Sequence, residues 1–94
     1  MLNNFIVTKD PDAILDYTFD WSAWLGTDAI TQSIWLISGG DNSLAQSTAS
    51  NTETGATIWL SGGSANRDYT LTNRITTVGG RTDDRSATIQ VRDR

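Results

Sequence analysis

One alternating stretch, residues 15–21, constrains the fold more than any other part of this sequence. In LDYTFDW every second residue is apolar, and polar residues fill the positions between them. A period of two is typical of a β-strand with one buried side and one solvent-facing side, whereas a helical period would place Asp16 and Asp20 beside the aromatic residues. We therefore predict a strand over residues 14–24 at the centre of the core. The residues predicted to share its buried side are Leu15, Tyr17, Phe19 and Trp21.

The rest of the chain divides into further short strands separated by turn signals. Pro11 and three glycine pairs, at 39–40, 62–63 and 79–80, mark turns. The other predicted strands cover residues 1–8, 29–37, 57–61, 69–78 and a last segment that includes Ala87 to Val91, while the polar run 43–54 is either a weak edge strand or a loop. About seven strands without a helix of any length predict an all-β, antiparallel sandwich that forms a single domain over residues 1–94, with a small barrel as the main alternative.

The composition excludes several classes of function. The chain has neither cysteine nor histidine, so it has no disulfide framework, and its serines lack the usual base for nucleophilic catalysis. The aspartates do not follow the spacing of a calcium loop, and we predict no metal, no other cofactor and no enzymatic activity. No apolar run is long enough to cross a membrane, no signal peptide opens the chain, and its acidic balance argues against nucleic acid.

Charge is distributed unevenly along the chain. Residues 1–54 hold seven acids and one base, a net charge of −6, whereas residues 55–94 hold four acids and six arginines, a net charge of +2. This split is either an ordinary mixed surface or a means of electrostatic docking between copies or onto a partner.

Tryptophan and arginine supply the candidate contact residues. Trp24 has the opposite parity to Trp21 unless a bulge turns the strand, and Trp35 and Trp59 each have apolar neighbours on both sides. Most of the four tryptophans are therefore core residues, or one or two lie at a protein contact or form a sugar-stacking platform. Two arginines flank the glycine turn at 79–80. The residues predicted to bind a partner are Arg81, Arg85, Trp24 and Trp59.

Tyr69 follows a glycine-rich turn at the start of a predicted strand. In immunoglobulin-like sandwiches a tyrosine near this place bonds back to the preceding loop, in an arrangement called the tyrosine corner. We predict this structural role for Tyr69.

Two long segments resemble a family of small bacteriophage proteins: KDPDAILDYTFDWSAWL at 9–25 and IWLSGGSANRDYTLTNRITTVGGRTDDRSATIQVRD at 58–93. The likeness covers nearly the whole chain and is weakest across residues 38–54. It implies a virion structural protein with an immunoglobulin-like fold, assembled in the host cytoplasm. It carries over no catalytic motif.

The functional hypothesis that follows is a capsid decoration or cement protein, which binds the major capsid protein and neighbouring copies of itself. One alternative is a structural component of a tail, neck or fibre. A second is a host-surface or carbohydrate-binding module displayed on the virion, for which exposed, adjacent tryptophans would be the mark.

Overall fold

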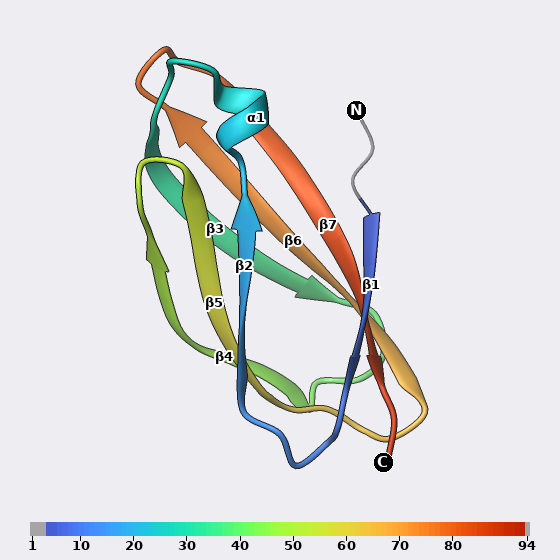
Figure 1. Ribbon diagram of the computed structural model, residues 1–94. Coiled ribbons are helices and arrows are strands. Elements are labelled where there is room, and N and C mark those ends of the chain that lie inside the picture. The colour runs from blue at the N-terminus through green and yellow to red at the C-terminus, as the bar shows by residue number, and fades with distance from the viewer. Residues whose placement is uncertain (1–3, 94) are drawn as a thin grey trace.

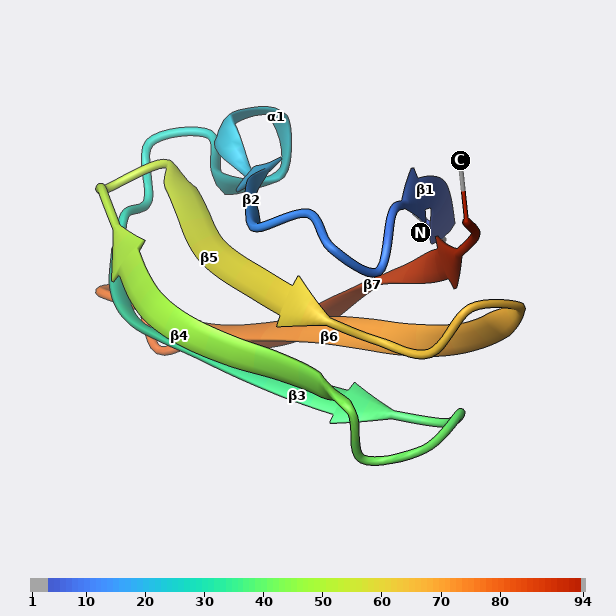
Figure 2. The ribbon, with the colours of Figure 1, turned by 90° about the horizontal axis from the view of Figure 1, so that it is seen from below.

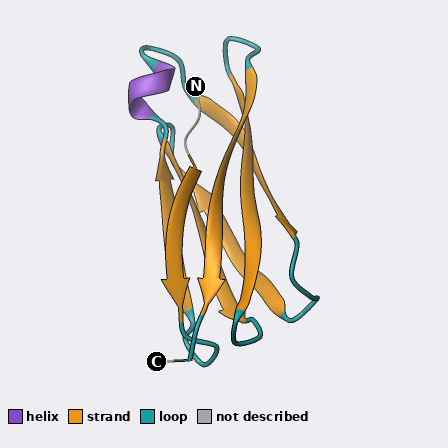
Figure 3. Ribbon diagram, turned by 90° about the vertical axis from the view of Figure 1, so that its right-hand side faces the viewer, coloured by secondary structure: helices purple, strands orange, loops and turns teal. Residues whose placement is uncertain are grey.

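Strands that run between two clusters of turns make up most of the fold, and one short helix lies at one end (Figures 1 and 3). The structure is a computed structural model that describes residues 4–93. The elements are β1 (Asn4–Lys9), β2 (Leu15–Asp20), α1 (Ser22–Leu25), β3 (Ile30–Ser38), β4 (Leu44–Asn51), β5 (Gly55–Gly62), β6 (Arg67–Thr77) and β7 (Thr82–Val91).

The strands form two facing sheets (Figure 2). One sheet has the order β1-β7-β6-β3 and the other the order β2-β5-β4. All pairs are antiparallel except β1 with β7, which run parallel from Asn4 opposite Ser86 to Lys9 opposite Val91. The prediction of an all-β sandwich is confirmed, and among the described strands the parallel pair departs from a purely antiparallel arrangement.

Side chains that alternate along each strand fill the space between the sheets. On β2, Phe19 is buried and meets Trp35 of β3 edge-to-face, with 5.0 Å between ring centroids. Trp21, just beyond β2, is almost fully buried, whereas Tyr17 is half-buried and Leu15 is exposed. Burial on the inner side of β2 therefore increases from the start of the strand toward α1.

Four polar residues among those described, Lys9, Asn73, Thr77 and Arg85, are buried with this apolar core. Asn73 is fully buried, where its amide oxygen accepts a 2.9 Å hydrogen bond from the Trp21 indole N–H and its amide nitrogen donates to Ser33 Oγ and the Ile34 carbonyl. The Lys9 ammonium donates to the carbonyls of Asp10 and Gly62. Burial lowers the pKa of Lys9, against the opposing effect of the nearby aspartates. Thr77 and Arg85, the other two, belong to the end of the molecule described below.

The predicted strand over residues 14–24 ends earlier in the structure, and the prediction that the chain lacks any helix is wrong. β2 stops at Asp20, whose carboxylate accepts the Ser22 N–H at 2.9 Å, and one helical turn follows. Gly26, at a φ of 62°, ends that turn in a conformation that other residues rarely adopt. The helical turn, and not a bulge, accounts for the changed parity of Trp24.

The polar run 43–54 contains a true strand, β4, which occupies the free edge of its sheet. Only its first residue, Leu44, is buried, and the remainder is exposed. An edge strand needs few apolar residues because one of its sides and its outer rim face water. The first predicted strand is β1 from Asn4 onward, and residues 1–3 of that prediction lie outside the described residues.

Candidate functional site

The end of the sandwich that carries α1 brings several predicted contact residues together. Here α1, the β4–β5 turn and the β6–β7 turn lie side by side (Figure 1). Backbone hydrogen bonds join them: Trp21 N–H donates to the Thr54 carbonyl, and Val78 N–H donates to the Ala29 carbonyl. Distant parts of the sequence therefore form one connected surface, called below the α1 end.

Arg81 and Trp24 are direct neighbours at the α1 end. The Arg81 guanidinium carbon lies 4.2 Å from the centroid of the Trp24 ring, and the same group donates to Asp28 Oδ2 and the Leu25 carbonyl, each at 3.0 Å. Hydrogen bonds from the Thr77 hydroxyl and the Gly79 N–H, with others from Ala29 and Arg81, hold the pKa of the Asp28 carboxyl well below its usual range. The carboxylate thus fixes the β6–β7 turn against the segment after α1.

Arg85 does not belong to the exposed surface, which removes the structural basis for its prediction as a partner-binding residue. Only 9% of the residue is exposed, its guanidinium carbon lies 4.1 Å from the centroid of the Trp21 ring, and it donates to the Asp20 carbonyl at 2.6 Å. Arg85 shares the parity of Ala87, Ile89 and Val91, which all face inward. This parity was the sequence signal for an inward-facing Arg85, but the charge of the side chain favoured an exposed position.

Val78 adds an exposed apolar side chain to the same end. It is 72% exposed at the start of the β6–β7 turn, while Trp24 is half-buried and Arg81 is exposed. We call Trp24, Val78 and Arg81 the end patch. A tryptophan, an arginine and an apolar side chain held on short, tethered segments have the composition of the residues that dominate protein–protein binding.

Tyr69 lies at the opposite end of the sandwich, where it joins two turns. Its hydroxyl donates to Asp41 Oδ1 at 2.6 Å and accepts the Ser64 N–H at 2.9 Å. A Cβ added to Gly40 would lie 2.6 Å from the Tyr69 ring, so the β3–β4 turn can pass over the ring only as glycine. Hydrogen bonds from Ser43, Ser64 and Tyr69 hold the pKa of the Asp41 carboxyl well below its usual range.

Replacing Tyr69 with phenylalanine is expected to lower the free energy of unfolding by about 1–2 kcal/mol, because Asp41 and the Ser64 N–H each lose a partner. The measurement is a urea titration followed by tryptophan fluorescence. Tyr17→Phe is the matched control, since the Tyr17 hydroxyl has no hydrogen-bond partner among the described residues. Equal midpoints for the two variants would contradict a stabilising corner.

Trp59, the remaining predicted contact residue, stands apart from the end patch. It projects from the outer side of β5, is 40% exposed, and lies opposite Asp16 of β2. Trp35 is buried in the core. The two exposed or half-exposed tryptophans, Trp24 and Trp59, are therefore not adjacent, and they do not form the paired platform expected of a sugar-binding module.

Neither a metal site nor a membrane span is found in the part of the chain that the structure describes. Residues 4–93 hold no group of three or more aspartate and glutamate side chains placed to bind one ion. No helix within the same range is long and apolar enough to cross a membrane.

Comparison with known protein families assigns the chain to one of them. A family model described as podophage GP4 fiber-tail adaptor protein gp77 matches residues 9–90. The chain belongs to this family. A comparison with curated proteins found no match. As a member of the gp77 family, the chain is a phage structural protein, as the sequence resemblance implied.

The family match also separates the functional hypotheses. Its description refers to a fibre and a tail, and so favours the tail, neck or fibre alternative over capsid decoration. It gives no support to the major capsid protein as the partner.

Proposed function

We propose that this protein is a structural adaptor that joins a fibre to the tail of a phage virion and catalyses no reaction of its own. The family match over residues 9–90 carries this proposal. The shape of the molecule supports it, because a sandwich 41 Å long and 19–25 Å across presents two well-separated ends and two sides. An adaptor needs at least two contact surfaces, one for each protein that it connects.

We propose the end patch as one of these surfaces. Trp24 is held between Arg81 and the Trp21 ring, whose centroid is 5.4 Å from its own, so that its position is fixed before a partner arrives. Pre-organised side chains lose less conformational freedom on binding than mobile ones. Val78 provides exposed apolar area at the same end of the sandwich.

The adaptor function is tested with particles produced without this protein. We expect them to lack fibres in electron micrographs, and we expect added purified protein to restore fibre attachment. Particles that retain their full set of fibres without the protein would contradict the proposal.

Val78→Glu is expected to reduce loading onto such particles by about tenfold or more, because it places a charge at the centre of the proposed contact. Folding should remain intact, since changes at exposed positions usually stay within about 0.5 kcal/mol. Loading is measured by co-sedimentation. Leu36→Glu, an exposed apolar residue on the outer side of β3, is the matched control. Equal loading of the two variants would exclude the end patch as a contact.

We further propose that the sandwich is immunoglobulin-like and forms one domain. The orders β2-β5-β4 and β7-β6-β3 correspond to the B-E-D and G-F-C strands of that fold. Tyr69 supports the assignment, because it lies near the start of the strand that corresponds to F and its hydroxyl bonds to the backbone five residues upstream.

A further inference from the structure

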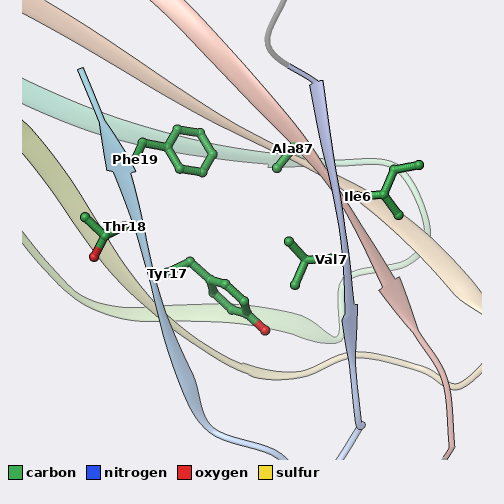
Figure 4. A pocket seen from close by; sticks show the side chains of 6 residues that line it. All are labelled: Ile6, Val7, Tyr17, Thr18, Phe19 and Ala87. Carbon is green, nitrogen blue, oxygen red and sulfur yellow. The ribbon is translucent and has the colours of Figure 1, made fainter. Parts of the chain in front are cut away.

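An apolar groove of about 320 Å³ lies between β1 and β2, and none of its lining residues belongs to the end patch (Figure 4). Its lining residues are Ile6, Val7, Tyr17, Thr18, Phe19 and Ala87. Tyr17 and Val7 extend toward each other from the two strands. A cavity of about 150 Å³ holds one benzene molecule, so this groove has room for roughly two side chains of that size.

Both strands that border the groove are edge strands. β1 ends one sheet and pairs only with β7, and β2 ends the other sheet and pairs only with β5, among the described residues. Each therefore has one edge that pairs with no other described strand of its sheet. Free edges of this kind are templates for an added strand from another chain.

Two further observations show that the groove is incomplete in the isolated chain. The Tyr17 hydroxyl is buried beside it with no hydrogen-bond partner among the described residues, an arrangement that costs free energy. Ile6 and Ile14, on β1 and in the β1–β2 turn, are 68% and 66% exposed. Exposed apolar side chains gathered beside the edge of a sheet are typical of an interaction surface.

Charge along the border of the groove indicates what its occupant carries. Asp12, Asp16 and Asp20 are exposed along β2 and the turn before it. The one basic residue of this segment, Lys9, is buried and bound to backbone carbonyls. The border is therefore negative, and it contributes much of the net charge of −6 in residues 1–54.

We propose that the groove binds an extended segment of another virion protein, in which apolar side chains alternate with lysine or arginine. The segment pairs with the free edge of β2, its apolar side chains enter the groove against Tyr17 and Phe19, and its basic side chains face the aspartates. This inference takes the class of the partner from the proposed adaptor function, and gives the adaptor a second contact surface distinct from the end patch.

A direct binding measurement tests the groove without reference to the virion. The probe is a short, dye-labelled peptide that alternates valine and lysine, titrated with the full-length protein and followed by fluorescence anisotropy. We expect Asp12→Asn/Asp16→Asn to weaken binding by roughly three- to tenfold, as befits the loss of two exposed charge pairs. The matched control, Glu53→Gln/Asp83→Asn, removes two exposed carboxylates elsewhere and is expected to bind as the parent does. A valine–glutamate peptide is expected not to bind.

Amide hydrogen exchange locates the bound peptide. We expect slower exchange in Leu15–Asp20, and Tyr17→Phe is expected to weaken binding without lowering thermal stability, because the hydroxyl that it removes has no hydrogen-bond partner among the described residues. Protection confined to the free edges of β3 or β4, or equal binding of both peptides, would overturn the proposal. So would a dimer of the parent protein in sedimentation that Asp12→Asn/Asp16→Asn dissociates, because the occupant would then be a second copy. Fibres that persist on particles without this protein would refute the adaptor function and leave the peptide result standing.

Discussion

Phe19→Ala is expected to lower the free energy of unfolding by about 3–5 kcal/mol, a large part of the stability of a domain of this size. Phe19 is 5% exposed, packs edge-to-face on Trp35, and also forms the floor of the β1–β2 groove. Its removal leaves a cavity that the two sheets can close only in part. Thermal unfolding followed by circular dichroism measures the effect.

The adjacent residue provides the control for this substitution. Thr18 is exposed on the outer side of β2, where its hydroxyl meets that of Thr57 at 2.8 Å. Thr18→Ala is expected to change stability by no more than about 0.5 kcal/mol. If Phe19→Ala melts as close to the parent as Thr18→Ala does, the inner side of β2 has been assigned wrongly.

Arg85→Glu is expected to leave much of the protein unfolded. The substitution would bury an unpaired carboxylate against the Trp21 ring and the Asp20 carbonyl, at a cost of several kcal/mol. Urea titration measures the stability of whatever fraction still folds. The sequence predicts Arg85 as a partner-binding residue, which implies an exposed side chain, whereas the structure buries it.

Two variants separate burial from charge in this test. Arg85→Met keeps an apolar stem on Trp21 and loses the hydrogen bond to Asp20, so we expect a smaller loss of about 1–2 kcal/mol. Arg67→Glu makes the same charge reversal at an exposed position and is expected to fold as the parent does. Parental stability in Arg85→Glu would show that the guanidinium faces solvent.

The inner row of β2 was largely predictable, because a period of two follows from strand geometry itself. The same period placed Asn73 between Leu71 and Ile75, and the structure buries it there. Arg85 belongs to the same kind of row. The sequence prediction placed Arg85 on the surface because arginine side chains are usually exposed, and it gave less weight to the alternation along the strand. A long side chain can nevertheless bury its stem and still bond a carbonyl with its head.

The helix and the groove were not predictable in the same way. A helix of four residues is too short to show a helical period in the sequence. The sequence sign of α1 was that Trp24 has the opposite parity to Trp21. The end patch depends on the β6–β7 turn meeting the segment after α1, about fifty residues away in sequence. The groove depends on which two strands end the sheets, and that topology has no signature in the pattern of any single strand.

The parallel pairing of β1 with β7 has a mechanical consequence. Because the two strands run in the same direction, the start of β1 and the end of β7 lie at opposite ends of the paired segment (Figure 1). A force that pulls Asn4 and Asp93 apart therefore acts along the strands, and it loads the hydrogen bonds of all six register pairs at once instead of opening them one after another. Shear of this kind requires many bonds to break together. A domain pulled through these two points is therefore expected to need a larger force to unfold than its modest size suggests.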